Sequence, residues 1–398
     1  MDVIIPQILF SLLGYAVCGR PIKEETAKLC TPENMQKVCA LAEHHDVSNL
    51  IAEALYDSGL HVQCADCYSQ ISRYQFQAVF RYEKSQHEFS RICTCLEQTA
   101  IPFIPLKGSV ICDYYPKPWM RTSCDIDILV PKDKVDAAAS ALVTACGYTI
   151  NGRSGHDISM TAKNGQHLEL HFALMEDFLS NSWTGVLENV WSKAVQAEPG
   201  TYRHLLMDDM QYFYHIAHMA KHFEWGGCGI RPFLDLWILD IVPGADLQRR
   251  KELLEQGGLL QFAEMMQKLG QAWLTGEKLD LQLHMLQDYI LTGGVYGSEK
   301  NQVMMQGQKS GSKLHYIQKR VFMSYDQLKC QYPVLQKHKW LTPAAQVLRW
   351  FRLLKTENRS RAKQEFKINR HRTDSSDALM RDLLESVGLS CNAGEEER

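Results

Sequence analysis

The sequence predicts an α+β protein in which a small mixed β-sheet core is flanked by N-terminal and C-terminal helical regions. Three observations support this class. Residues 101–175 alternate between short strand-like and helical segments, whereas the chain on either side has mainly helical periodicity. Within this stretch Asn164-Gly165 separates two short alternating runs, which is the strongest local signal for a β-hairpin. Residues 68–99 carry apolar side chains at the spacing of one long amphipathic helix.

The 398 residues suffice for about two or three domains. Changes in composition divide the chain into an N-terminal helical region, the sheet-containing core, a C-terminal helical region and a charged tail, at residues 1–100, 101–175, 176–355 and 356–398. We expect an irregular chain in two places. Residues 293–313 are rich in glycine and polar side chains, and the tail is highly charged with few apolar residues.

Composition limits the partners and the compartment. The net charge of -3 gives no indication of nucleic-acid binding. The 13 scattered cysteines argue against a disulfide framework and favour a reducing cytoplasm. The apolar segment 1–19 has Asp2 and Pro6 but no basic start, so a packed helix is favoured over a signal peptide. With no stretch apolar and long enough to cross a bilayer, we expect a cytoplasmic protein without a membrane partner.

The helices and the strand-like runs follow from local signals. Thr31 followed by proline is typical of a capped helix start. Residues 134–146 are rich in alanine and therefore favour a helix, with Gly147 as its C-cap. Residues 156–162 and 166–172 are the two runs on either side of Asn164-Gly165.

A strand that begins with two acids is the first candidate for chemistry. Residues 125–130 read Asp-Ile-Asp-Ile-Leu-Val, so Asp125 and Asp127 lie on one face while Ile126 and Ile128 face the core. Two adjacent carboxylates repel each other unless a cation lies between them. Magnesium prefers such oxygen ligands together with substrate phosphates. The pair therefore indicates a metal site, and the alternative is a solvated strand face.

Two neighbouring segments strengthen the metal interpretation. Lys107-Gly108-Ser109 follow an apolar run, and a Gly-Ser turn that opens a helix presents backbone N–H groups to a phosphate. In the run His-Leu-Glu-Leu-His-Phe, the leucines face one way, so Glu169 lies on the opposite, polar face as a third acid. Together these groups predict a site for a metal-bound nucleoside triphosphate.

Several cysteines and histidines could also bind a metal ion, but their spacing in the sequence favours a metal site less than the acids do. The cysteines at positions 64, 67, 93 and 95 include a pair with poor zinc spacing, so packed cysteines are favoured. His215, His218 and His222 share one helical face without an acidic ligand, which favours histidines that pack or line a cleft.

The chain resembles the nucleotidyltransferase superfamily that includes DNA polymerase beta, whose pattern is a Gly-Ser turn, an Asp-x-Asp strand and a third acid. It is more closely similar to a bacterial family of uncharacterised nucleotidyltransferases. The resemblance rests on LKGSVICDYYPKPWMRTSCDIDILV, with Arg121 shortly before the acids, and on HLELHF; it extends through HIAHMAKH and RPFLDLW to FMSYDQLKCQYP. There are two departures: fifteen residues separate Ser109 from Asp125, and the third acid is a glutamate.

This resemblance implies a catalytic mechanism. Asp125, Asp127 and Glu169 would hold two Mg²⁺ ions, and Glu169 would help to deprotonate the nucleophile. The triphosphate would be bound by the Gly-Ser turn and by two cations, a set that comprises Lys107, Gly108, Ser109 and Arg121. For Arg121, a structural role as a partner of the aspartates is an equal alternative.

Two classes of function remain open. The first is an enzyme that moves a nucleoside monophosphate from a triphosphate to a hydroxyl of a small molecule or a protein, including an antitoxin-like enzyme that modifies a partner protein. The second is a non-catalytic nucleotide-binding or partner-binding protein that retains the fold. The presence of all three acids and the turn favours catalysis.

The acceptor is expected to bind to the helical region after residue 176. The acids and the Gly-Ser turn would already bind the metal and the triphosphate, so little of the core remains to bind an acceptor. A binding cleft also needs a second wall, which the helical region could form. Residues 226–229, rich in glycine, would let two helices turn back against the sheet. The candidates for acceptor binding are His218, Lys221, His222, Arg231 and Asp235. The alternative is that this region only packs, with Arg231 and Asp235 as a structural pair.

Overall fold

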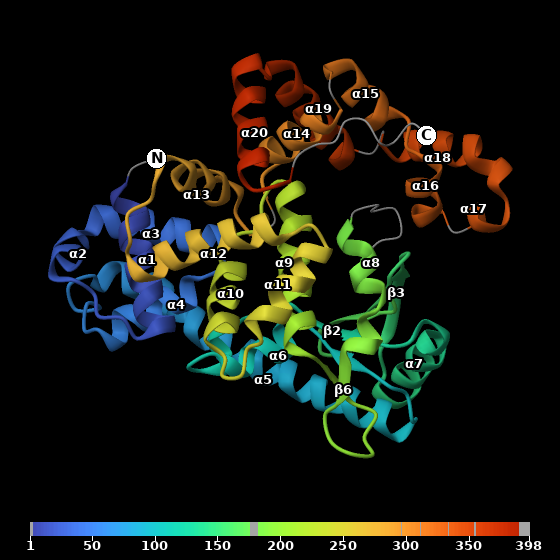
Figure 1. Cartoon of the computed structure of the whole chain (residues 1–398), viewed down its shortest axis with the longest axis horizontal. Coiled ribbons are helices and arrows are strands. Elements are labelled where there is room, and N and C mark those ends of the chain that lie inside the picture. Colours follow the sequence, from blue (N-terminus) through green and yellow to red (C-terminus); the bar gives the residue numbers. More distant parts are fainter. Residues whose placement is uncertain are drawn as a thin grey trace. The chain divides into compact units, whose positions relative to one another are not determined.

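The computed structural model describes residues 3–175, 182–295, 297–310, 312–332, 334–353 and 356–389. It consists of two compact units (Figure 1). The first is formed by Met1–Ala217 with Ile230–Leu283, and the second by His218–Gly229 with His284–Arg398. The helix α9 (Asp208–Glu224) begins in the first unit and ends in the second.

Helices form the start of the first unit. They are α1 (Ile4–Cys18), α2 (Glu24–Leu29), α3 (Pro32–His44), α4 (Ser48–Asp57) and α5 (Ala65–Gln98). The apolar segment that starts the chain is packed as expected, because Ile8, Leu9 and Leu12 of α1 are fully buried. The predicted cap is also confirmed, since the Thr31 side chain accepts a hydrogen bond from the Asn34 N–H at 3.4 Å.

A five-stranded mixed sheet follows, which confirms the predicted α+β class. Its strands are β1 (Ile104–Pro105), β2 (Asp125–Leu129), β3 (Thr149–Arg153), β4 (Asp157–Thr161) and β5 (His167–His171). Their order is β1-β2-β5-β4-β3, in which only β2 and β5 run parallel among the described pairs. The hairpin between β4 and β5 turns at Asn164-Gly165 as predicted, and Gly165 takes a φ of 80° that suits glycine.

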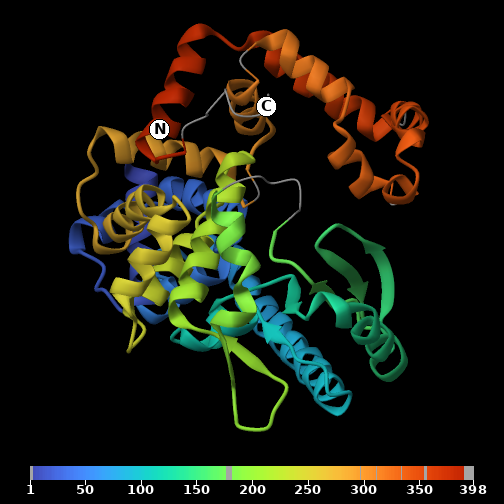
Figure 2. The ribbon, with the colours of Figure 1, turned by 45° about the vertical axis from the view of Figure 1, so that its right-hand side comes forward.

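One face of the sheet is apolar and buried under two helices. Ile126 and Ile128 of β2 and Leu168 of β5 are fully buried in this core. They pack with side chains of α5 and of α7 (Val135–Ala141), which continues as one π-helical turn to Gly147. The long α5 helix runs beside the sheet in both views (Figures 1 and 2). The alternation of apolar and polar residues therefore leaves the acids on the other face.

The rest of the first unit is mainly helical, as expected, and contains one hairpin that the sequence did not reveal. Short strands β6 (Ala194–Gln196) and β7 (His204–Leu206) pair antiparallel. The helices are α6 (Gly108–Ile111), α8 (Ser182–Glu188), α10 (Arg231–Ile241), α11 (Leu247–Gln256) and α12 (Leu260–Thr275). No described helix is apolar and long enough to cross a bilayer.

The second unit is helical in both places where an irregular chain was expected. Its further helices are α13 (Leu281–Gly293), α14 (Glu299–Lys309), α15 (Lys313–Val321), α16 (Tyr325–Gln331), α17 (Val334–Lys337), α18 (Thr342–Leu353), α19 (Thr356–His371) and α20 (Asp374–Ser386). Thus α14 replaces part of the expected loop, and α19 and α20 replace most of the expected irregular tail. Sparse apolar residues suffice because α20 buries Met380, Leu383 and Leu384. The last residues, 390–398, lie outside the described part.

Among the cysteines that the structure describes, one pair forms a disulfide that composition did not indicate. Cys39 of α3 and Cys67 of α5 are joined by a disulfide with an S–S distance of 2.10 Å. Cys67 is therefore not available to share a zinc ion with Cys64. Cys95 lies against Cys146 in the core beneath the sheet, which agrees with a packing role.

Candidate functional site

Parallel pairing of β2 with β5 brings two acids side by side. Asp127 lies opposite Glu169 in the register, and Asp125 lies opposite His167. Because cross-strand partners share a face of the sheet, the Asp127 and Glu169 carboxylates meet on its polar side. One oxygen of each, with one ring nitrogen of His171, falls within a group whose atoms are all within 4.8 Å of one another. The arrangement has the residue types of a divalent-metal site.

Asp127 is the best buried and most strongly paired of the acids. It is only 2% exposed, and its Oδ1 lies 2.8 Å from Lys107 Nζ and 2.9 Å from His171 Nε2. Burial by itself would raise the pKa of Asp127, but the Lys107 charge and the contact with His171 outweigh it and the pKa is lowered. Conversely, burial opposes the charged forms of Lys107 and His171, yet the adjacent carboxylate raises both pKa values.

The negative charge of Asp125 is less well compensated by neighbouring groups than that of Asp127. Burial and the negative charge of Asp127 raise the pKa of Asp125, and Glu169 adds to this effect. A hydrogen bond from Ser123 Oγ at 2.8 Å acts in the opposite direction without cancelling it. A cation between these carboxylates would remove the repulsion, so the residues fit a divalent ion.

The Lys107-Gly108 turn packs closely against the segment that precedes the Asp strand. Lys107 adopts a positive φ of 49°, which is unusual for a residue with a side chain. A Cβ on Gly108 would lie 3.2 Å from Ser123 Cβ and 3.3 Å from Arg121 Nη1, so these neighbours would have to shift and the close approach favours glycine. The Ser109 N–H donates to the Leu106 carbonyl at 3.2 Å, so it is less available to a phosphate than the sequence suggested.

Arg121 pairs with an acid far away in the sequence. Its Nε lies 2.8 and 3.0 Å from the two carboxylate oxygens of Asp235 on α10, and Tyr115 Oη donates to the same carboxylate at 2.7 Å. Burial would raise the pKa of Asp235, but the Arg121 charge prevails and lowers it. Arg121 is thus held by Asp235, and not by the strand aspartates that we considered as its structural partners.

The comparisons with known proteins agree with this architecture. The sequence model of a family described as uncharacterised nucleotidyltransferases matches residues 31–275, which is more than half of the chain. The chain belongs to this family. No curated protein and no solved structure gives a significant match. The matched range contains all the acids discussed above but ends before FMSYDQLKCQYP, which the resemblance was expected to reach.

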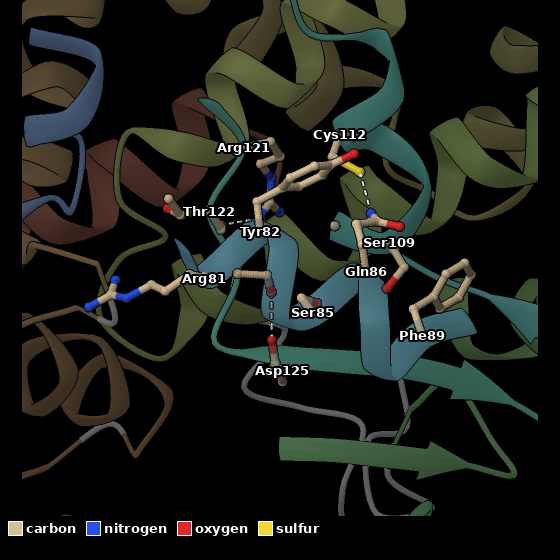
Figure 3. Close-up of a pocket in the computed structure, with 12 residues that line it drawn as sticks. Arg81, Tyr82, Ser85, Gln86, Phe89, Ser109, Cys112, Arg121, Thr122 and Asp125 are labelled. Carbon is tan, nitrogen blue, oxygen red and sulfur yellow. Dashed lines mark hydrogen bonds between the residues drawn. The ribbon is translucent and has the colours of Figure 1, made fainter. Parts of the chain in front are cut away.

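A pocket lies beside Asp125 of the candidate site (Figure 3). Its lining includes Gly108, Ser109, Arg121 and Asp125 from the predicted site. The opposite wall is formed by α5 through Arg81, Tyr82, Ser85, Gln86 and Phe89. In Figure 3 the Tyr82 ring extends toward Cys112, whereas the Arg81 side chain points away from Tyr82 and Cys112. The pocket therefore combines a cationic and hydroxyl-bearing side with an aromatic wall.

Sequence reasoning missed three contributions to this site. The α5 wall was interpreted only as an amphipathic helix, although its pocket residues recur at helical spacing. The contact of His171 with Asp127 could not be read from the sequence, because it depends on the register between β5 and β2. Tyr214 of α9 is close enough that Asp127 and Glu169 help to raise its pKa, together with its burial. No local pattern marks Tyr214.

The acceptor candidates are distributed over both units. In the first unit, Arg231 pairs with the carboxylate of Asp46 and also donates to its carbonyl oxygen at 3.0 Å. Asp235 is 1% exposed and occupied by Arg121, so Arg231 and Asp235 do not form the structural pair considered above. In the second unit, His218 and His222 approach each other at 3.2 Å between their Nε2 atoms, and Lys221 lies between them in sequence.

His215, the third histidine of the α9 face, has a packing role. Its Nε2 is 2.9 Å from the Pro232 carbonyl, and burial lowers its pKa. This outcome agrees with the interpretation that histidines on this helix are satisfied within the fold.

Proposed function

We propose that the protein is a metal-dependent nucleotidyltransferase that moves a nucleoside monophosphate from a triphosphate to a hydroxyl of a small molecule or protein. The observation that carries the proposal is the register that sets Asp127 beside Glu169, with Asp125 two residues along the same strand. Membership of a nucleotidyltransferase family supports the same reaction class.

Asp125, Asp127 and Glu169 would hold Mg²⁺, with two ions at the site. Burial and the negative charge of Asp127 raise the pKa of Asp125, and a cation between the carboxylates would relieve the second of these two effects, which supports this assignment. When bound, such ions neutralise the triphosphate oxygens and activate the attacking hydroxyl. Lys107 Nζ and His171 Nε2 both contact Oδ1 of Asp127, which leaves Oδ2 as its more available ligand atom.

The remaining roles, which are proton acceptance, triphosphate binding and positioning, are assigned to different side chains. Glu169 accepts the proton of the acceptor hydroxyl, whose oxygen then forms a bond to the α-phosphorus. The bond from the α-phosphorus to the bridging oxygen breaks, and pyrophosphate leaves with that electron pair. Lys107, Gly108, Ser109 and Arg121 bind the triphosphate, the two cations by neutralising its charge. Asp235 acts as a positioning residue, because its carboxylate fixes the Arg121 guanidinium.

For the acceptor, we retain two separate sets of proposed contacts, namely Arg231 in the first unit and His218, Lys221 and His222 in the second. Lys221 offers a cation and the histidines offer ring nitrogens, which suit a polar acceptor. The burial of Asp235 supports an indirect role for that residue instead of direct contact.

The test follows the two ends of the triphosphate separately. The protein is incubated with Mg²⁺, a cell extract and each nucleoside triphosphate, labelled either at the α-phosphate or at the γ-phosphate. We expect the α label in a product and the γ label in pyrophosphate, and neither transfer with the Asp125→Asn variant. Transfer of the γ label would instead mean phosphoryl transfer.

The same assay addresses the alternative classes. A label that migrates with a protein indicates a protein acceptor, as in the antitoxin-like case, whereas a low-mass product indicates a small molecule. Tight Mg²⁺-dependent nucleotide binding with no transfer to any fraction would favour the non-catalytic binding protein.

A further inference from the structure

His171 has one ring nitrogen that the candidate active site does not use. Its Nε2 lies 2.9 Å from Asp127 Oδ1, which fixes the ring and assigns this nitrogen to the carboxylate. Its Nδ1 is buried and has no hydrogen-bond partner among the described residues. The whole residue is only 3% exposed. Buried polar atoms almost always have a partner, so Nδ1 needs an explanation.

Two further side chains that can bind a metal ion, those of Asp157 and His156, lie next to the His171 ring. Asp157, the first residue of β4, is directly opposite His171 in the antiparallel register, so their side chains share a face. His156 precedes it, and its ring centre is 5.8 Å from that of His171. One ligand atom of each residue belongs to a group whose members are all within 4.8 Å of one another. The group lies at the end of β5, beyond the three acids of the candidate active site.

Ser154 contacts the side chains of two members of this group, His156 and Asp157. Its Oγ is 3.0 Å from His156 Nδ1 and also donates to the Asp157 carboxylate. The same oxygen accepts from the backbone N–H groups of His156 and Asp157 at 3.2 and 3.1 Å. A partner on Nδ1 of His156 orients its Nε2 as the ligand atom, which is how metal-binding histidines are usually held.

We propose that His156, Asp157 and His171 bind one divalent transition-metal ion of the zinc type, with His171 contributing Nδ1. Two imidazole nitrogens and one carboxylate oxygen suit zinc and its neighbours, whereas magnesium prefers oxygen ligands throughout. Tetrahedral ligands about 2.0 Å from zinc are roughly 3.3 Å apart, so small side-chain rotations would close the present spacing.

The ion would give the orphaned nitrogen its partner and complete a carboxylate–histidine–metal arrangement through Asp127. Because Asp127 binds the opposite nitrogen of the same ring, the ion also fixes the orientation of an acid of the candidate active site. The ion would thus act on the candidate active site through His171, and it is distinct from the Mg²⁺ ions proposed at the three acids.

Metal titration of the full-length protein tests this site without any activity assay. After removal of metals with a chelator, Co²⁺ is added as a spectroscopic probe and Zn²⁺ binding is measured by calorimetry. We expect one Co²⁺ per chain with a visible absorption band typical of nitrogen ligands, displaced by Zn²⁺ but not by a large excess of Mg²⁺. Absence of a bound Co²⁺ or Zn²⁺ ion would overturn the proposal.

Variants assign the ion to its ligands. His156→Gln and Asp157→Asn should each abolish the cobalt band, and Ser154→Ala should weaken Zn²⁺ binding by about 10–100-fold, as loss of an outer-shell partner usually does. His204→Gln on β7 is the matched control and should bind as the wild type does. Circular dichroism without metal checks that each variant is folded, and the two ligand variants provide independent tests.

Two other variants separate this site from the proposed nucleotidyl transfer. Asp125→Asn and Glu169→Gln should abolish transfer but retain the cobalt band and its displacement by Zn²⁺. If instead they abolish the band while His156→Gln retains it, the ion lies at the three acids and the separate site is refuted. The proposed transfer reaction would be unaffected by that result.

Discussion

The Arg121 guanidinium and the Asp235 carboxylate form a buried ion pair between residues that are 114 positions apart. Arg121 is 11% and Asp235 is 2% exposed in the side chain, so water screens the pair poorly. Tyr115 adds a hydrogen bond to the same carboxylate. The pair links the segment before the Asp strand to α10, and Arg121 itself lines the pocket.

The first prediction concerns the stability that this pair provides. Asp235→Asn keeps the shape of the side chain but leaves the Arg121 charge buried without its partner. We expect a loss of about 3–5 kcal/mol in the free energy of unfolding, as for other broken buried pairs. Urea unfolding at neutral pH measures it. A loss below about 1 kcal/mol, the range of exposed pairs, would contradict the buried pair.

The second prediction is the pH dependence of the same pair. The folded pKa of Asp235 is lowered, so its contribution to stability is present above the unfolded pKa of about 3.9 and is lost as the pH falls through the folded value. Wild-type stability should therefore decrease below about pH 4 more steeply than that of Asp235→Asn. Parallel curves for the two proteins in urea unfolding from pH 6 downward would argue against the shifted carboxyl.

The third prediction separates the two strand aspartates. Asp127 is neutralised by Lys107 and His171, whereas Asp125 is repelled by its neighbours. In a chelating buffer, Asp127→Asn should lose about 3–5 kcal/mol of unfolding free energy because the buried Lys107 charge loses its partner and His171 loses its carboxylate contact. Asp125→Asn should be unchanged or more stable. The sequence analysis treated the two aspartates alike, as carboxylates that repel each other, and did not distinguish their environments.

Both aspartate variants should lose nucleotidyl transfer despite their opposite effects on stability. Chemical unfolding with and without Mg²⁺ supplies the comparison, and the wild type should gain more from Mg²⁺ than either variant. Equal stability of the two variants in the chelating buffer would contradict the assigned pairing of Asp127.

The fourth prediction concerns the acceptor. Lys221→Ala should raise the KM for the acceptor by about tenfold, the value of a 1.4 kcal/mol contact, and leave triphosphate affinity nearly unchanged. Lys300→Ala, an exposed lysine of α14, is the matched control. Steady-state kinetics with each substrate varied gives both parameters. If Lys221→Ala first weakens triphosphate binding, Lys221 belongs to the nucleotide site.

Much of the core followed from local rules. Alternation predicted which residues of Asp125–Leu129 face the core, because consecutive side chains point to opposite faces of a strand. Asn164-Gly165 predicted the hairpin, because glycine adopts a positive φ at little cost. The tail was predicted wrongly, because few apolar residues suffice when α20 has a surface to pack against.

What the sequence by itself determined is the α+β class, the hairpin at Asn164-Gly165 and the strand face on which Asp125, Asp127 and Glu169 lie. The strand order, the pairing of Arg121 with Asp235 and the α5 wall of the pocket were decided only by the tertiary structure. The physical reason is that periodicity and turn chemistry act over a few neighbouring residues. Charge pairing and burial depend instead on which distant segments come into contact. The same local sequence pattern around Arg121 is therefore compatible with several ion-pair partners, and only the tertiary structure shows that the partner is Asp235.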